Sequence, residues 1–119
     1  MLFICYPQCS TCQKARKWLD DYQIAYEFRD IKTEHPTAAE LKEWQKKSRL
    51  PLKRFFNTSG QLYRDLKLKD RLSALSQEEQ LIMLASDGML VKRPLLITEK
   101  HVLVGFDPIE WEDKLIGGC

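Results

Sequence analysis

The stretch LFICYPQCSTCQKARKWLDDYQIAYEF, residues 2–28, decides the fold class. Its start, Leu2–Tyr6, is apolar and favours β structure until Pro7 ends the run, which predicts a buried strand. Apolar residues then recur at helical spacing and predict a helix from about Ser10 to Tyr22. Residues 24–28 alternate and predict a second strand. A strand, a helix and a strand joined by short connections form a βαβ unit, whose two strands run parallel.

The rest of the chain predicts a block of helices followed by a β-hairpin. The capping boxes Thr37–Glu40 and Ser76–Glu79 each begin a helix. The runs PLLIT (94–98) and HVLVGF (101–106) flank a turn and predict two antiparallel strands. Asp107–Pro108 then begins a last helix.

The order of these elements is that of a thioredoxin-like α/β fold with a mixed four-stranded sheet. The helical block, about residues 37–88, is expected to be an insertion that covers one end of the sheet. With 119 residues the chain is expected to be a single domain, residues 1–119, because it is long enough for one hydrophobic core.

Composition narrows the class of protein. With 44% hydrophobic and 30% charged residues, the sequence is typical of a soluble globular protein. No apolar run approaches the roughly 20 residues that span a bilayer, and no signal-peptide pattern is visible, so we expect no membrane partner and a cytoplasmic protein. A net charge of +2 gives little reason to expect a direct nucleic-acid partner. Four cysteines in the cytoplasm favour catalytic, redox or metal roles over stabilising disulfides.

Cys9 and Cys12 stand three residues apart at the start of the first helix, on one face. Free N–H groups and the helix dipole at that end favour an anion, so a thiolate at Cys9 is stabilised. Cys12, one turn further in, is placed to attack a mixed disulfide on Cys9. This spacing beside a βαβ pattern favours a redox pair.

Two other interpretations of the cysteines stay open. They can be small apolar residues of the core. They can also belong to a structural zinc site, which needs four ligands. The remaining candidate ligands are Cys5, Cys119, His35 and His101. Their spacing is not typical of a metal site, so we expect no metal. Cys5 is expected to be buried and inert in its strand, Cys119 to be an exposed thiol of a frayed tail, and the histidines to lie in loops.

Lys92, Arg93 and Pro94 precede the first hairpin strand. X-Pro bonds are the peptide bonds that adopt the cis form at low cost. In a thioredoxin-like arrangement this proline faces the cysteine loop, and the basic residue before it reaches a thiolate or an anionic substrate. The alternative, an ordinary proline at the start of a strand, stays open. A second basic cluster is expected to be a solvated helix surface: Lys46, Lys47, Arg49, Lys53 and Arg54.

Four segments together resemble the arsenate reductase/Spx family over nearly the whole chain: PQCSTCQKA (7–15), LYRDL (62–66), SDGMLVKRPL (86–95) and VGF (104–106). The resemblance implies the same thioredoxin-like fold. Glutaredoxin-coupled arsenate reductases use one nucleophilic cysteine at the position of Cys9 and three arginines that hold the oxyanion. Arg93 matches one of them, but the others fall near Asn57 and Gly105, so weak arsenate reduction is expected.

The Spx branch resembles this chain at C-x-x-C and at Gly105 with the aromatic residue after it. Spx proteins are transcriptional regulators that sense oxidation through C-x-x-C and bind the C-terminal domain of the RNA polymerase α subunit. The segment that would carry the polymerase contacts, Leu50–Ser59, has no clear match. A redox-sensing regulator that binds polymerase is therefore the alternative function.

We expect a thiol–disulfide oxidoreductase with Cys9 as nucleophile, Cys12 as resolving thiol and Arg93 as the group that stabilises the thiolate or an anion. No bound cofactor is expected, and the reducing equivalents would come from glutathione, glutaredoxin or thioredoxin. The residues expected to shape the site are Ser10, Thr11 and Pro94, and Pro94 is expected to be a cis-proline.

Overall fold

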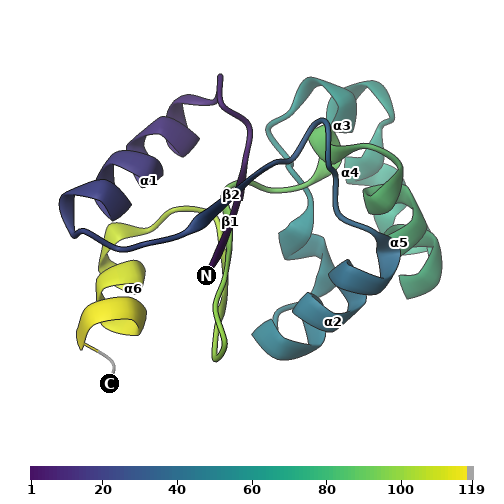
Figure 1. Cartoon of the computed structure of the whole chain (residues 1–119). Helices are drawn as coiled ribbons and strands as arrows, with labels where there is room; N and C mark the ends of the chain where they lie inside the picture. Colours follow the sequence, from purple (N-terminus) through teal and green to yellow (C-terminus); the bar gives the residue numbers. More distant parts are fainter. Residues whose placement is uncertain (118–119) are drawn as a thin grey trace.

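A four-stranded mixed sheet organises the computed structural model, which describes residues 1–117 (Figure 1). The strand order is β2-β1-β3-β4, with bounds β1 Leu2–Cys5, β2 Glu27–Asp30, β3 Leu95–Ile97 and β4 Val102–Val104. β1 pairs with β2 in parallel and with β3 antiparallel, and β3 pairs antiparallel with β4. The predicted parallel βαβ unit, the hairpin and the mixed α/β sheet are all confirmed.

Helix α1, Ser10–Asp21, connects β1 to β2 as predicted, but β2 begins three residues later than expected. Gln23 has a left-handed φ of 57°, and the N–H of Ile24 still bonds to the carbonyl of Leu19 at the end of α1. Residues 23 and 24 therefore complete the end of α1, and pairing of β2 with β1 starts at Glu27. The expected alternation survives, since Ile24, Tyr26 and Phe28 all pack on the same core cluster.

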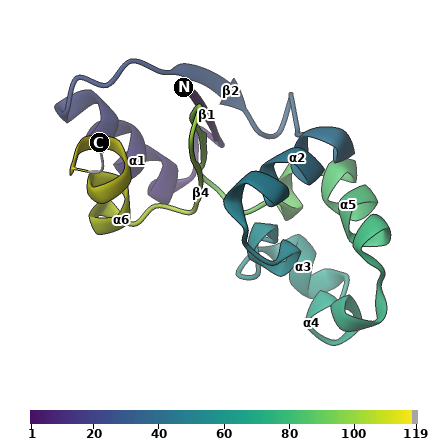
Figure 2. The same ribbon diagram turned by 90° about the horizontal axis from the view of Figure 1, so that it is seen from below.

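One face of the sheet is covered by α1 and by α6, Pro108–Glu112, which continues into a π-helical segment, Asp113–Gly117 (Figures 1 and 2). Asp107 caps α6, as predicted. Within α6, Trp111 is buried, whereas Ile109 is 81% exposed. The buried core of this face consists of Phe3, Cys5, Cys12, Ala15, Leu19, Leu96, Leu103 and Trp111.

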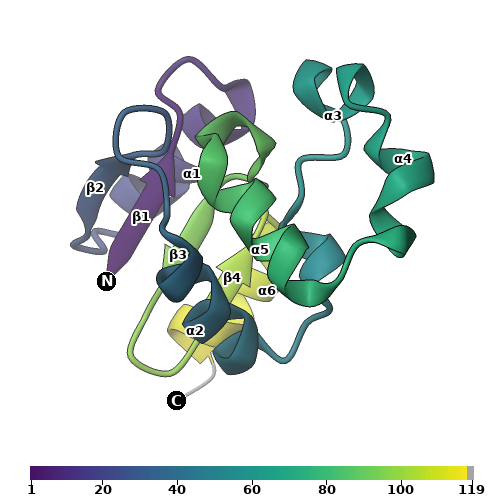
Figure 3. The same ribbon diagram turned by 90° about the vertical axis from the view of Figure 1, so that its right-hand side faces the viewer.

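The opposite face is covered by the helical insertion, which corrects the expectation that it would cover one end of the sheet (Figure 1). Its elements are α2 Ala38–Ser48, η1 Leu52–Phe55, α3 Gln61–Asp65, α4 Leu68–Arg71, η2 Leu72–Ala74, α5 Gln77–Ser86 and η3 Gly88–Leu90. Figure 3 shows α2 and α5 in front of the sheet, with α3 and α4 to one side.

Side-chain alternation along the strands explains why both faces are covered. Successive residues of a strand point to opposite faces. Ile4 and Leu95 belong to the core beneath the insertion, whereas Phe3, Cys5 and Leu96 belong to the core beneath α1 and α6. The strands are therefore apolar on both sides, and each side needs its own layer of helices.

The insertion is held by local devices that the sequence predicted and by one close approach that it did not. Both capping boxes, at the starts of α2 and α5, are present in full. A Cβ atom on Gly88 would lie 1.8 Å from the carbonyl oxygen of Ile31, so only glycine lets η3 pack against the chain that leaves β2. No helix within residues 1–117 is both long enough and apolar enough to cross a membrane. Cys119 lies outside the described residues, so the expectation for it stays a prediction.

Candidate active site at the start of helix α1

Cys9 is the N-cap residue of α1 and carries the one free thiol among the described residues. Its N–H donates to the carbonyl of Tyr6 at 2.9 Å, and its own carbonyl accepts from the N–H of Gln13 at 3.0 Å. No side chain caps this helix, and its first turn contains no acidic residue. The half-buried sulfur therefore sits where unpaired backbone N–H groups converge.

The surroundings of Cys9 favour its thiolate. Partial burial raises the pKa of the thiol, but the backbone N–H groups of Cys12 and Thr11 lower it, as do the hydrogen bond and the positive charge of Arg93. The net result is a pKa below the ordinary value. The geometry thus matches the physical reason for which Cys9 was singled out in the sequence.

Arg93 and Pro94 lie across from the start of α1. The Arg93–Pro94 bond is cis, as predicted, and the carbonyl of the buried Pro94 accepts from the N–H of Gly105 at 2.8 Å. The guanidinium of Arg93 lies 5.8 Å from the ring centre of Tyr6 and makes a 3.4 Å contact with the carbonyl of Met89. Its buried Nε has no hydrogen-bond partner in the structure.

A pocket of about 290 Å³ opens beside the Cys9 sulfur. It brings together four parts of the chain that are distant in sequence: the start of α1, the turn before α3, the segment before β3 and the segment after β4. Two cationic side chains line it together with small polar groups, a composition that suits an anionic ligand. The lining residues are Cys9, Thr11, Asn57, Ser59, Gly60, Lys92, Arg93 and Phe106.

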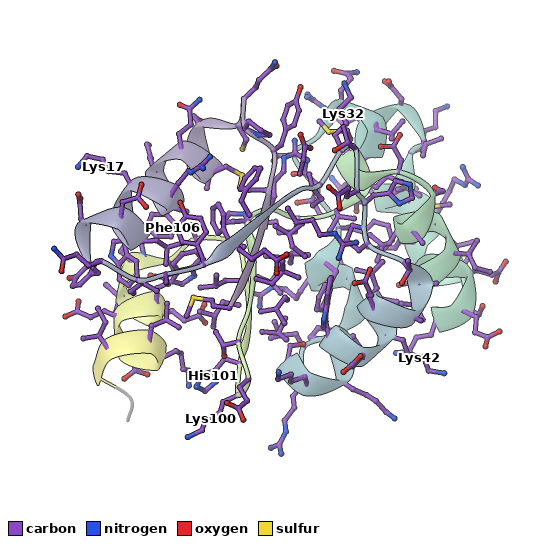
Figure 4. The ribbon with its side chains drawn as sticks, viewed as in Figure 1. Lys17, Lys32, Lys42, Lys100, His101 and Phe106 are labelled. Atoms are coloured by element: carbon purple, nitrogen blue, oxygen red, sulfur yellow. A yellow bond between two sulfur atoms is a disulfide. The ribbon has the colours of Figure 1, made fainter. Side chains whose placement is uncertain are left out.

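The pocket contains only some of the site residues expected from the sequence. Cys9, Thr11 and Arg93 line it, whereas Ser10 and Pro94 do not. Ser59, Gly60 and Lys92 are lining residues that sequence reasoning did not assign to the site. Ser59 and Gly60 have no local signal, because they join the pocket only through tertiary packing, whereas Lys92 belongs to the basic segment before Pro94. Phe106 contacts both Trp18 and Trp111, and Figure 4 shows it between α1 and α6.

The two positions without arginine have structural explanations. Asn57 is buried, its N–H donates to the carbonyl of Leu90 at 2.7 Å, and its Oδ1 accepts from the hydroxyl of Ser59 at 3.3 Å. Gly105 has a φ of +82°, which side chains rarely adopt, and a Cβ there would lie 3.3 Å from Cε of Lys92. Lys92 therefore lies beside the position where a third arginine would stand.

Cys12 corrects part of the sequence interpretation, because it is bonded to Cys5 and not to Cys9. The Cα atoms of Cys5 and Cys12 are 5.9 Å apart, and the N–H of Tyr6 lies 3.4 Å from Sγ of Cys12. Cys5 is buried, as expected, but it is bonded to Cys12 and is not a separate core thiol. Both residues face the space between β1 and α1, which brings their sulfurs together. The resolving role of Cys12 stays a prediction.

The other titratable candidates do not gather at the site. Within residues 1–117, no three His, Cys, Asp or Glu side chains come together as metal ligands. His35 is exposed in the loop before α2, and His101 lies at the tip of the β3–β4 hairpin (Figure 4). The basic side chains of residues 46–54 are exposed, as expected for a solvated surface.

The mixed sheet, the cysteine at the start of α1 and the cis-proline opposite it define a thioredoxin-like protein. The ArsC family model matches residues 5–114, and the chain belongs to the ArsC family. An uncharacterised Bacillus subtilis protein, YusI, is 47% identical over 114 residues, covering 96% of this chain and 97% of YusI. The global transcriptional regulator Spx of Staphylococcus saprophyticus is 30% identical over 104 residues, covering 87% of this chain and 78% of Spx.

A solved structure shows the same fold. The crystal structure of a Bacteroides fragilis protein, described as related to the ArsC family, superposes with a TM-score of 0.92 at 55% identity. The match covers 94% of each chain. The family resemblance noted from the sequence is therefore confirmed.

Proposed function

We propose that this protein is a cytoplasmic thiol–disulfide oxidoreductase in which Cys9 is the nucleophile. The observation that carries the proposal is the position of Cys9: a free thiol of lowered pKa, at an uncapped helix start, beside a pocket with two cations. A thiolate is the reactive form of cysteine, so lowering its pKa increases the reactive fraction at neutral pH.

The proposed reaction is thiol–disulfide exchange. The Cys9 thiolate attacks one sulfur of a substrate disulfide, forms a mixed disulfide and releases the other sulfur as a thiolate. Arg93 and Lys92 attract the anionic part of the substrate, and Thr11 and Ser59 offer hydroxyl groups. Glutathione, glutaredoxin or thioredoxin returns the protein to its reduced form, and no bound cofactor takes part.

Arsenate is proposed to be a poor substrate. Arg93 is the single arginine that lines the pocket, and Asn57 offers an amide where the resemblance places a second guanidinium. Charge-assisted bonds are about twice as strong as neutral ones, so their loss weakens oxyanion binding. We expect an efficiency with arsenate below about 10⁴ M⁻¹s⁻¹ when glutathione and glutaredoxin are supplied.

An activity panel on Cys9→Ser tests the proposal. The substrates are arsenate, a glutathionylated peptide and a low-molecular-weight disulfide. Cys9→Ser is expected to lower turnover of the best substrate by at least about a thousandfold, because it removes the nucleophile. Cys119→Ser makes the same sulfur-to-oxygen change outside the C-x-x-C motif and is expected to retain activity. Full turnover by Cys9→Ser would refute the proposal.

The similarity to Spx favours a redox-sensing regulator as the second candidate. The segment that would carry polymerase contacts, residues 50–59, runs beside the Cys9 pocket, since Asn57 and Ser59 line it. A pull-down with the C-terminal domain of the polymerase α subunit, using reduced and oxidised protein, separates the two candidates. Redox-dependent capture together with no turnover in the activity panel would favour the regulator.

A further inference from the structure

The Cys5–Cys12 disulfide is closed off from solvent. Cys5 is 0% exposed and Cys12 is 3% exposed. The hollow that reaches them, between Pro7, Gln13 and Arg16, measures about 40 Å³. This volume is close to the roughly 30 Å³ of one water molecule and far below the roughly 300 Å³ of a small-molecule site. A glutathione molecule or a protein thiol therefore has no direct access to either sulfur.

Cys9, in contrast to the disulfide, can be reached from solvent. It lines the 290 Å³ pocket and also packs against the core cluster that contains Cys5 and Cys12. The backbone N–H of Cys12 helps to lower the pKa of the Cys9 thiol, while the sulfur of Cys12 is bonded to Cys5. Cys12 thus lies between the accessible thiol of Cys9 and the buried sulfur of Cys5.

We propose that Cys5 is a third redox residue, which takes the disulfide from the Cys9–Cys12 pair and stores it in the core. This inference rests on the proposed function. Cys9 attacks a disulfide RSSR′, forms Cys9–S–S–R and releases R′S⁻. The thiolate of Cys12 attacks the Cys9 sulfur and releases RS⁻. The thiolate of Cys5 then attacks the Cys12 sulfur and releases the Cys9 thiolate.

The sum of these steps is balanced. One substrate disulfide becomes two thiols, RSH and R′SH, and the thiols of Cys5 and Cys12 become one disulfide, with two electrons and two protons transferred. The structure corresponds to the last state, with Cys5 joined to Cys12 and Cys9 free. Reduction runs in reverse: Cys9 attacks the Cys12 sulfur and Cys5 leaves. The N–H of Tyr6, 3.4 Å from Sγ of Cys12, stabilises charge on Cys12 in the steps where it is a thiolate.

The test follows the three thiols in time. Cys5, Cys9 and Cys12 lie on one tryptic peptide, residues 1–14, and Cys119→Ser removes the remaining thiol. Reduced protein is mixed with glutathione disulfide, quenched with N-ethylmaleimide at intervals and mapped by fragment-ion mass spectrometry. We expect the Cys9–glutathione adduct first, then Cys9–Cys12, then Cys5–Cys12.

Three variants sharpen the test. Cys5→Ala is expected to stop at Cys9–Cys12, and Cys12→Ser is expected to stop at the Cys9–glutathione adduct. Cys9→Ser is expected to slow formation of the Cys5–Cys12 disulfide at least a hundredfold, because it removes the accessible thiol that reacts first with the substrate. The order of appearance in the parent protein tests the relay even if Cys5→Ala fails to fold.

Two results would overturn the relay while leaving the proposed function intact: a parent protein that stops at Cys9–Cys12, or a Cys9→Ser protein that forms Cys5–Cys12 at the parent rate. Failure of the proposed function looks different. In that case Cys12→Ser forms no glutathione adduct at Cys9.

Discussion

Helices α1 and α2 begin in opposite ways. At α2, the hydroxyl of Thr37 accepts from the N–H of Glu40, and the Glu40 carboxylate accepts from the N–H of Thr37. At α1, the N-cap is Cys9, and no side chain satisfies the first N–H groups. The same positive helix end is therefore used for stability in α2 and left available to a thiolate in α1.

The arginines near the two helix starts differ in the same way. Two guanidinium nitrogens of Arg29 donate to the carboxylate of Glu40, at 2.8 and 2.9 Å, and a third donates to the carbonyl of Glu34. Arg93 has no carboxylate within ion-pair distance in residues 1–117, and its Nε is unpartnered. An arginine without a fixed counter-ion keeps its charge available to Cys9 or to a ligand.

Capping α1 is expected to exchange reactivity for stability, and this is the largest predicted effect. Cys9→Asp places a good N-cap residue at the open helix start. Turnover should fall by at least about a thousandfold because the nucleophile is lost. The free energy of unfolding should rise by about 1 kcal/mol. Activity assays and urea titration measure the two effects. A destabilised Cys9→Asp protein would show that the open helix end lacks the donors assigned to it.

The ion pair at α2 is expected to give a pH-dependent stability. Arg29 lowers the pKa of Glu40 to about 2, despite the opposing effect of partial burial. This stabilisation is fully present above the unfolded-state pKa of about 4.5 and is lost as pH falls through about 2.

Glu40→Gln isolates that charge, because glutamine still completes the capping box. At pH 7 we expect it to cost about 1–2 kcal/mol, after discounting for the 33% of the Glu40 side chain that is exposed. Urea titrations between pH 7 and pH 2 measure it. The gap between parent and variant should close over the acid half of that range, and a constant gap would contradict the ion-pair explanation.

The hydroxyl of Thr37 is expected to have a smaller effect than the charge of Glu40. Thr37→Ala removes the cap of α2 and should cost about 1 kcal/mol of unfolding free energy. Because Thr37 does not line the pocket, turnover should be unchanged. A loss of activity without a loss of stability would link α2 to the reactive site and break the contrast between the helices.

Local patterns predicted much of this fold. The strand β1, the helix α1 and both capping boxes depend on residues close in sequence, so periodicity and capping chemistry found them. The sequence predicted less well which side chains of a helix are buried. Ile82 and Ile109 are apolar residues of the predicted helices, yet they are 66% and 81% exposed, because a helix buries only the side chains of one face.

The candidate site was predicted only in part, for a physical reason. Cys9 and Arg93 carry signals of their own, a helix start and a residue before proline. Ser59 and Gly60 join the pocket through packing of segments far apart in the chain. The Cys5–Cys12 bond had an available signal, since Phe3 and Cys5 alternate with Ile4 and so face α1. The burial of Cys5 was interpreted as a sign that it is inert, so its bond to Cys12 was not predicted.

The pKa of Cys9 tests the central claim, that the open start of α1 and Arg93 together activate this thiol. In the Cys119→Ser protein with the Cys5–Cys12 disulfide intact, Cys9 is the single thiol, so thiolate absorbance near 240 nm follows it against pH. The account predicts a pKa below the ordinary value of about 8.5. It also predicts a rise in Arg93→Ala but no change in Arg54→Ala, which removes an exposed arginine outside the pocket. A Cys9 pKa at or above the ordinary value, or one indifferent to Arg93→Ala, would contradict it.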